Sequence, residues 1–453
     1  MQFRRRTLRT AIIASAALGL IAGGSVLALA SRSGAQASIA LSAAQTSTAC
    51  ATAWNSTAIY TAGNQASENG INYTANWWTQ GNNPATNNGG AGSGQPWTSD
   101  GACTGGSGSG PSPSPSPSPS PSPSSSSGTG TGTTGSASGV LFSPYKDVTI
   151  NMNWNTDQMQ SAVEGSDRPV VGSGSLVSTY VPRLPAITLA FATGACGSEN
   201  WGGVPGASFA SENVPQLQAA GLNYVVSTGG EAGTFTCGST AGMESFIARY
   251  ASPHLVGIDF DIEGGQSESD IQNLVASAAG AQSEYPNIQF SFTLATLAAS
   301  DGSYGGVNSL GNEVVQAVLG SSLKNYAINL MTMDFGSASS SVCVVVNGSC
   351  EMGQSSIQAV KNLEHTYGIP ASKIAVTPMI GLNDNTSETF TTADVDTLTS
   401  YVKSNGLAGL HFWSLDRDTP CSSATGYASP TCNSVSGTTA LEYTNRFLSD
   451  LGL

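Results

Sequence analysis

One stretch near the middle of this chain decides its fold: His254-Leu255-Val256-Gly257-Ile258-Asp259-Phe260-Asp261-Ile262-Glu263-Gly264-Gly265. Successive side chains of a β-strand point to opposite faces, so Asp259, Asp261 and Glu263 share one face. The Ile-Phe-Ile residues between them cover the other face, which is typical of a buried strand. We therefore expect a buried strand that carries three carboxylates on one side and ends at the glycine pair.

The three carboxylates form a costly arrangement, because like charges roughly 7 Å apart beside an apolar stripe repel one another. Repulsion raises the proton affinity of at least one member, and such perturbed groups gather at catalytic sites. A solvated strand end and a site for a hard cation such as calcium are alternative interpretations. The buried reverse face of the strand favours acid/base catalysis over both.

Short β-rich segments alternate with helical segments from residue 140 onward, which is the pattern of βα units. The expected strands are 147–153, 186–192, 224–227, 255–263, 289–295, 327–333, 374–380 and 407–413. The expected helices include 205–220, 243–250, 268–285, 312–320, 355–367 and 392–404. Eight units predict an α/β fold, the (β/α)8 TIM barrel, whose active site gathers where the strands end.

Several other expected strand ends also carry polar, sulfur-containing or aromatic residues. Each is a weak signal alone, because such residues occur in ordinary turns and cores as well. The residues are Ser227, Gly229, Gly230, Met331, Met333, Asp334, Asn383 and Trp413.

Taken together, these strand ends resemble glycoside hydrolase family 18, the chitinases, over essentially all of residues 140–453. The most specific element is the family's Asp-x-x-Asp-x-Asp-x-Glu signature, which here has Val256 in place of the first aspartate. The family's Ser-x-Gly-Gly element is matched by Ser227, Gly229 and Gly230. The resemblance implies a TIM-barrel hydrolase of chitin that needs no metal or other cofactor.

A second departure from the family concerns its Met-x-Tyr-Asp element, which reads Met331-Thr332-Met333-Asp334 here. The tyrosine that usually donates to the acetamido oxygen of the substrate is therefore absent. Another donor must take over. Asn383 and Tyr145 are the two candidates, and the sequence leaves both open.

The mechanism that the resemblance implies is retaining and uses the acetamido group of the substrate as nucleophile. Glu263 would be the general acid and base, and Asp261 would orient the acetamido group. Asp259 would share a proton with Asp261 in a coupled titration. The pocket would be lined by Trp413, as the floor under the reacting sugar, and by Met331 and Asp334.

The segment 381–406, between the last two expected strands, leaves room for little beyond one crossover helix. We therefore expect a shallow groove and endo cleavage, which is the activity of an endochitinase. A non-hydrolytic chitin lectin on the same barrel is one alternative, and the presence of Glu263 argues against it. An endo-β-N-acetylglucosaminidase is another.

The domain organisation follows from composition. An arginine-rich start followed by an apolar stretch predicts an export signal over residues 1–37, so we expect a secreted, extracellular protein with no stable membrane association after cleavage. Alternating proline and serine within residues 105–139 indicate an extended linker. The expected folded parts are 46–104 and 140–453.

The first folded part holds many aromatic residues and few aliphatic ones. Its tyrosine and tryptophan pattern resembles the type 3 chitin-binding module, a small β-structure that binds crystalline chitin through exposed rings. We expect Tyr60, Trp77 and Trp78 to contact chitin. Trp54 and Trp97 are expected in the core.

Net charge limits the classes of partner that the chain can bind, and the cysteine content indicates disulfides. Five of the 15 basic residues lie in the expected signal, so the mature chain carries 10 basic against 29 acidic residues, a net charge of −19. Nucleic acid and anionic membranes are therefore poor partners. Chitin and chitooligosaccharides are the partners that the resemblance implies, and we expect the chain to be a monomer. Eight cysteines in an exported chain suggest disulfides, which sequence order pairs as Cys50–Cys103, Cys196–Cys237, Cys343–Cys350 and Cys421–Cys432.

Overall fold

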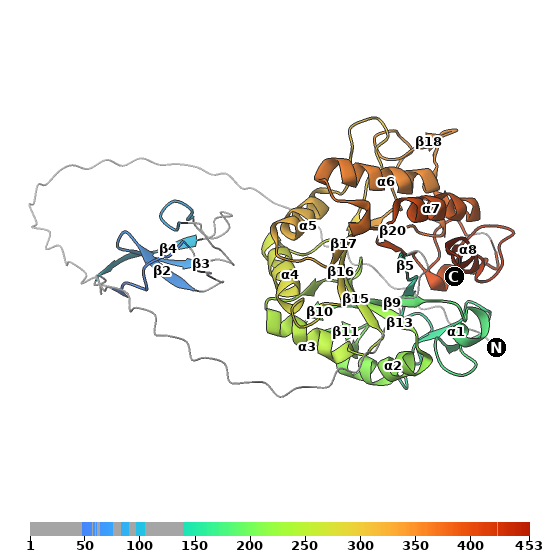
Figure 1. The fold of residues 1–453 in the computed structure, drawn as a ribbon, viewed down its shortest axis with the longest axis horizontal. Coiled ribbons are helices and arrows are strands. Elements are labelled where there is room, and N and C mark those ends of the chain that lie inside the picture. Colours follow the sequence, from blue (N-terminus) through green and yellow to red (C-terminus); the bar gives the residue numbers. More distant parts are fainter. Residues whose placement is uncertain are drawn as a thin grey trace, which may run out of the picture. The chain divides into compact units, whose positions relative to one another are not determined.

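The computed structural model describes residues 48–56, 58, 60, 64–75, 83–89, 97–104, 139–423 and 425–453. These residues form a small β-structure before residue 105 and a large α/β structure after residue 138 (Figure 1). The expected signal, Trp77, Trp78 and residues 105–138 of the expected linker lie outside the described residues.

The large part is a closed barrel of parallel strands surrounded by helices, as expected (Figure 1). Its nine-stranded sheet has the order β5-β23-β20-β17-β16-β15-β13-β9-β6. The strands are β5 (Leu141–Phe142), β6 (Tyr145–Asp147), β9 (Ala186–Ala192), β13 (Asn223–Gly229), β15 (Leu255–Ile262), β16 (Gln289–Ala295), β17 (Tyr326–Met331), β20 (Ile374–Thr377) and β23 (Gly409–Leu410).

The first barrel strand is where the sequence prediction was wrong. The expected strand 147–153 consists mainly of turns, and β5 and β6 together occupy the first position in the barrel. The reason is local: the Asp147 carboxylate accepts hydrogen bonds from the backbone N–H and the hydroxyl of Thr149, and Asn151 adopts a positive φ of 60°. A side chain that bonds its own following backbone in this way favours a turn over a strand.

The helices cover the outside of the sheet (Figure 1). The six expected helices are present as α2 (Gly206–Ala220), α3 (Thr240–Tyr250), α4 (Glu268–Ala281), α5 (Ser309–Gly320), α6 (Met352–Tyr367) and α7 (Thr392–Asn405). Two further helices, α1 (Leu176–Tyr180) and α8 (Glu442–Leu451), were not expected. Serine, threonine and asparagine caps start most of them; Ser267, for example, forms a capping box with Asp270.

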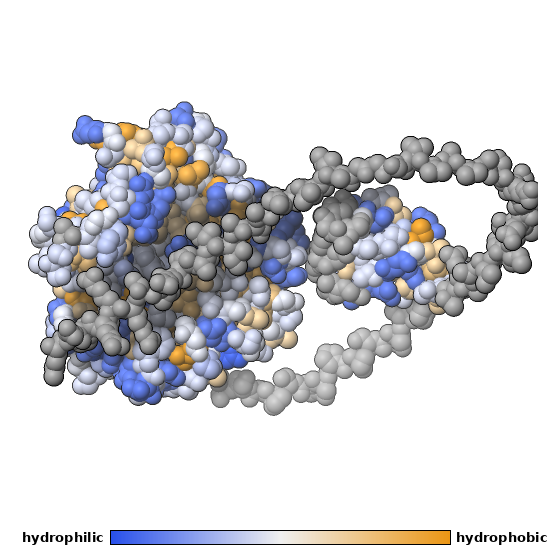
Figure 2. Space-filling view, turned by 180° about the vertical axis from the view of Figure 1, so that it is seen from behind, coloured by the Kyte–Doolittle hydropathy of each residue, from blue (hydrophilic) through white to orange (hydrophobic). Residues whose placement is uncertain are grey.

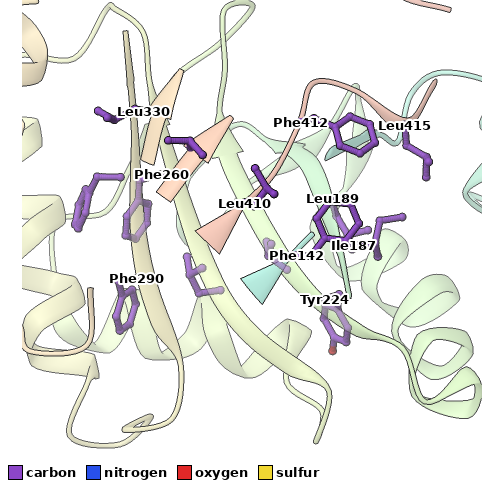
Figure 3. Packing of buried hydrophobic residues seen from close by; sticks show 14 of the residues in the cluster. Phe142, Ile187, Leu189, Tyr224, Phe260, Phe290, Leu330, Leu410, Phe412 and Leu415 are labelled. Carbon is purple, nitrogen blue, oxygen red and sulfur yellow. The ribbon is translucent and has the colours of Figure 1, made fainter. Parts of the chain in front are cut away.

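The apolar core lies between the sheet and the helices, whereas the inside of the barrel is largely polar. Phe260 and Phe290 on neighbouring strands stack with ring centroids 6.2 Å apart, and Figure 3 shows them within this core. The outer surface of the barrel is mostly hydrophilic to neutral in the view of Figure 2. The alternation of Ile-Phe-Ile with carboxylates thus separates an apolar outer face of β15 from a polar inner face.

Fully buried polar side chains fill the interior of the barrel. They come from almost every strand and include Ser143, Thr188, Ser227, Thr293, Asn329 and Thr377. Barrel interiors are more often packed with branched apolar residues. A polar interior is stable only when its groups are hydrogen-bonded, and here they bond to one another, as Ser143 does to Thr188 at 2.6 Å.

The small part is a four-stranded sheet with the order β1-β4-β3-β2. Its strands are β1 (Thr48–Ala49), β2 (Gln65–Glu68), β3 (Ile71–Ala75) and β4 (Trp97–Thr104). Trp97 is fully buried at its centre, as expected, and Trp54 packs against it. The Cys50–Cys103 disulfide closes this sheet, and the other three disulfides also join the pairs expected from sequence order.

No helix among the described residues is both long enough and apolar enough to cross a membrane.

Candidate active site

The three carboxylates project from β15 at the centre of the parallel sheet, towards the end where the strands finish. The neighbours of β15 are β13 and β16, whose register places Ser227 and Ser291 on either side of Asp259. One step further along, Gly229 and Thr293 flank Asp261. The depth of each carboxylate in the barrel is therefore set by the strand register.

Asp259 is buried and receives four hydroxyl hydrogen bonds from other strands. Its Oδ2 accepts from Tyr145 at 2.9 Å and from Ser227 at 2.6 Å. Its Oδ1 accepts from Ser291 at 2.6 Å and from Thr293 at 2.7 Å. Four donors from other strands hold the Asp259 carboxylate in one orientation deep in the barrel.

Asp261 lies one layer higher and has a different environment. Its side chain is 4% exposed, and its Oδ1 has no hydrogen-bond partner among the described residues. Burial, followed by the charges of Glu263 and Asp259, raises the pKa of Asp261 well above its usual range. Asp261 is therefore a buried acid that holds its proton more tightly than an ordinary aspartate does, and one of its oxygens faces no donor among the described residues.

Glu263 stands just beyond the end of β15, where its side chain reaches solvent. Partial burial raises the pKa of Glu263 to about 7, with further contributions from the carboxylates of Glu231 and Asp334. A carboxyl group with a pKa near neutrality can both donate and accept a proton during a reaction. The environments of the three acids thus differ in order, from Asp259 with its four hydroxyl donors to Glu263 at the solvent-facing end.

The glycines of the Ser-x-Gly-Gly element allow close approach of backbones beside this cluster. Gly229 has a φ of +88°, and a Cβ there would lie 2.1 Å from the carbonyl oxygen of Asp261. A Cβ at Gly230 would lie 2.8 Å from the ring of Phe191. Larger residues at either position would push β13 away from β15 and from the aromatic wall.

An aromatic wall closes one side of the mouth. Trp413 is half-buried and stacks on Phe191 with centroids 5.5 Å apart and an interplanar angle of 18°. Tyr145 lies beneath both rings, with centroids 6.1 and 6.2 Å away. Phe191 was missed from the sequence, although it stands near the end of the expected strand 186–192 and that position could have indicated it.

The segment after β17 carries the residues of the altered family element. Met331 and Met333 are half-buried, whereas Asp334 is exposed and adopts a φ of +51°. Asp334 Oδ1 accepts a hydrogen bond from the backbone N–H of Asn385 at 2.8 Å. Although the residue as a whole is exposed, partial desolvation of its carboxyl group is the main cause that raises the pKa of Asp334 above its ordinary value.

The two candidate replacements for the missing tyrosine are engaged elsewhere. Asn383 is fully buried, and its Nδ2 donates to the carbonyls of Met379 and Gly381 at 3.0 Å each. The Tyr145 hydroxyl donates to Asp259, deep in the barrel. With their hydrogens committed in this way, neither side chain is arranged in this structure to donate to a ligand at the mouth.

Two charged residues that the sequence did not single out organise the rim. Glu388 is fully buried and accepts hydrogen bonds from the segment after β17. Arg417 is buried beneath the segment after β20, and its guanidinium donates to the carbonyls of Ile380 and Ser429. Glu388 lies in a loop and Arg417 in a short 3-10 helix (Leu415–Arg417), so no strand pattern could have indicated them.

In the small part, Tyr60 is half-buried and packs edge-on against Trp97, with ring centroids 4.9 Å apart. Its hydroxyl accepts a hydrogen bond from the backbone of Asn55 at 2.8 Å. The structure therefore brings Tyr60 into contact with the small core. Within the described residues of the whole chain, no group of histidine, cysteine or acidic side chains is placed to hold a metal ion.

The closed barrel and the acids at its strand ends define the class: a (β/α)8 barrel with a candidate acid/base site in the usual position for that fold. Among solved structures, the chain is similar to active domain 2 of the thermostable chitinase from Pyrococcus furiosus, a structure of catalytic-site mutants complexed with chito-oligosaccharides. The identity is 22% and the TM-score 0.52, over 69% of this chain and 95% of that chain. The likeness supports the barrel fold.

No family model matches the chain. Among curated proteins, it is similar to the probable bifunctional chitinase/lysozyme of Escherichia coli K12 and to endochitinase 11 of Metarhizium anisopliae, each 25% identical over 228 residues. The match covers 46% of this chain, 24% of the first relative and 42% of the second. The chain thus spans less than half the length of these curated relatives.

Proposed function

We propose that this chain is a secreted chitinase that hydrolyses β-1,4-linked N-acetylglucosamine polymers, with Glu263 as general acid and base. The observation that carries the proposal is the graded environment of the acids along and just after β15, from Asp259 with its four hydroxyl donors to Glu263, whose pKa is raised to about 7. Such a gradient separates the roles of neighbouring carboxylates. The names of the curated relatives and of the structural neighbour support chitin as the substrate.

In the first step, Glu263 donates its proton to the glycosidic oxygen. The bond from that oxygen to the anomeric carbon breaks, and the acetamido oxygen of the same sugar forms a new bond to that carbon. The product is an oxazolinium ion, so no nucleophile from the protein is required. In the second step, water attacks the anomeric carbon while the Glu263 carboxylate takes its proton, and the acetamido oxygen leaves with the β-configuration retained.

Asp261 orients the acetamido group in this scheme. Its buried Oδ1, which has no partner among the described residues, accepts the acetamido N–H, and its proton is shared with Asp259. The hydroxyl groups around Asp259 hold its carboxyl group in place, so that it can share that proton with Asp261. The donor to the acetamido oxygen is not assigned to Asn383 or Tyr145, because both are engaged elsewhere.

Several further features fit an endo-acting enzyme on an insoluble polymer. The segment between the last two barrel strands holds a short hairpin, β21 (Gly381–Leu382) and β22 (Thr389–Phe390), and helix α7, with no additional domain. An open groove would bind the middle of a polymer chain, with Trp413 as the floor under the reacting sugar. Residues 46–104 would tether the barrel to chitin, with Tyr60, Trp77 and Trp78 as contacts, and four disulfides suit an oxidising compartment.

The decisive experiment measures release of reducing ends from colloidal chitin and from soluble N-acetylglucosamine oligomers. We expect activity in the unaltered chain and a loss of about 10²–10⁴-fold in kcat for Glu263→Gln, the contribution typical of a general acid. Glu284→Gln, an exposed change outside the mouth, is the matched control and should retain activity. Equal activity of Glu263→Gln and the unaltered chain would refute the proposal.

A further inference from the structure

We propose that Glu388 is a positioning residue that fixes the segment after β17, so that Asp334 stands beside Glu263 in the mouth of the barrel. The inference rests on the proposed function only for the role of Glu263. The structural part of the inference is that the buried Glu388 carboxylate sets the position of Asp334. This part can be tested without any substrate.

Glu388 binds that segment through successive backbone groups. Its Oε2 accepts from the N–H of Phe335 and its Oε1 from the N–H of Gly336, each at 3.0 Å. The side chain of Asn385 adds a third donor, at 2.7 Å from Oε1. A fully buried carboxylate with three donors is held in one geometry, and it holds its partners in turn.

Asp334 directly precedes the two backbone groups that Glu388 binds. It adopts a left-handed conformation with φ of +51°, which costs free energy for a residue with a side chain unless its surroundings enforce it. Its Oδ1 accepts from the backbone N–H of Asn385 at 2.8 Å. The hairpin of β21 and β22 therefore fixes Asp334 twice, once through its own carboxylate and once through the backbone that follows it.

The charged groups around Glu263 come from several elements. Asp261 lies on the same strand, Glu231 follows β13, and Asp334 follows β17. Asp334 itself faces Asp384, after β20, and Arg417, after β23. The guanidinium of Arg417 is bound to backbone carbonyls, so it does not replace Asp334 as the neighbour of Glu263.

Asp334 is one of the two carboxylates beyond the strand that raise the pKa of Glu263. If Glu388 releases the segment, Asp334 can move away from the mouth, and the pKa of Glu263 falls towards its ordinary value. Glu388 does not itself raise the pKa of Glu263, whereas it binds the two residues that follow Asp334, so the inferred route from Glu388 to Glu263 runs through Asp334.

The test follows the titration of Glu263 by NMR in chains labelled with ¹³C at the glutamate carboxyl carbons, with the signal assigned by its absence from Glu263→Gln. The variants are Glu388→Gln, which loses one carboxylate acceptor, Asp334→Asn, and the two combined. Asn385→Ala is a second variant that keeps the Glu388 carboxylate and removes one of its donors, together with the side-chain bonds of Asn385 to the Gly336 carbonyl and to Ser387. It keeps the inference testable if Glu388→Gln does not fold.

Asp418→Asn is the matched control. Asp418 is also fully buried and accepts backbone N–H bonds, from Tyr443 and Thr444, but these hold the start of α8. Its substitution should lower the melting temperature without moving the titration of Glu263. This control separates a general loss of stability from a specific loss of position.

We expect Glu388→Gln and Asp334→Asn to shift the Glu263 titration downward in pH by similar amounts, and the double variant to show no further shift. Asn385→Ala should produce a smaller shift in the same direction. An unmoved titration in Glu388→Gln, or a further shift of full size in the double variant, would overturn the inference. Failure of the proposed function would instead appear as absent chitin hydrolysis with these NMR shifts intact.

If the chain hydrolyses chitin, the pH dependence of kcat/KM supplies a second readout. The alkaline limb, which reports loss of the Glu263 proton, should move to lower pH in Glu388→Gln. A shift by one pH unit corresponds to about a tenfold loss of kcat/KM well above the limb. A limb that stays in place despite a shifted NMR titration would count against Asp334 acting on the general acid during turnover.

Discussion

The hydroxyl of Tyr145 donates a hydrogen bond of 2.9 Å to Oδ2 of Asp259, and the two residues are 114 positions apart in the sequence. Tyr145 lies on β6, which completes the first position of the barrel, whereas Asp259 lies on β15. The bond therefore crosses the interior of the barrel. It links the innermost acid to the first position of the barrel, where β5 pairs with the last strand and β6 pairs with β9.

Tyr145→Phe should destabilise the protein while leaving the barrel intact. A buried hydrogen bond to a charged group contributes about 1.5–3 kcal/mol, so we expect a decrease of that size in the free energy of unfolding by urea. Tyr285→Phe is the control, because the hydroxyl of Tyr285 makes only a long bond of 3.4 Å to a neutral backbone carbonyl. Equal decreases in the free energy of unfolding of both variants would show that the hydrogen bond from Tyr145 to Asp259 contributes no more to stability than the long bond of Tyr285.

Stability should fall as pH rises from about 4 to about 7. Burial raises the pKa of Asp416 and that of Asp418 to about 6, and the pKa of Glu263 to about 7. The folded chain then binds more protons than the unfolded chain in this range, so the stabilisation is fully present below the unfolded pKa values and is lost as pH rises through the folded ones.

For the fully buried Asp418, the effect is on the order of 3 kcal/mol. Melting temperatures measured from pH 4 to pH 8 test this expectation, with Asp418→Asn as the comparison. That variant should have a flatter profile than the unaltered chain. A melting temperature that rises steadily from pH 4 to pH 7 would contradict the assignment of raised pKa values to these buried acids.

Cleavage should depend on the acetamido group of the sugar that reacts. Because the proposed nucleophile belongs to the substrate, fully deacetylated oligomers should not be cleaved, whereas fully acetylated oligomers of the same length should be. The new reducing ends should appear first as the β-anomer, which NMR detects before mutarotation. Initial release of the α-anomer would exclude the retaining mechanism.

The first folded part should matter for insoluble substrate and not for soluble substrate. A chain starting at residue 139 should cleave soluble oligomers at an unchanged rate but release fewer products from crystalline chitin, since the tethered binder raises the local concentration of the barrel. Trp77→Ala with Trp78→Ala in the full chain should have the same effect. Unchanged action on crystalline chitin in both cases would remove the binding role of residues 46–104.

The sequence allowed the barrel to be predicted well, because strand and helix periodicity are local properties. The expected strands 186–192 and 289–295 coincide with β9 and β16. The first strand was misplaced because the local bonds of Asp147 form a turn that hydrophobic pattern alone does not reveal. Sequence order was also enough for the disulfides, since each pair joins the next cysteine along the chain.

The candidate site, like the fold, could be predicted from the sequence only in part. That Asp259, Asp261 and Glu263 face one direction follows from the sequence alone, because alternation along a strand needs no other part of the chain. Which of them is held by hydroxyl donors, and which have a raised pKa, was decided only by the tertiary structure. The hydroxyls around Asp259, the wall of Phe191 and Trp413, and the buried Glu388 come from strands and loops far apart in sequence, and barrel closure alone brings them together.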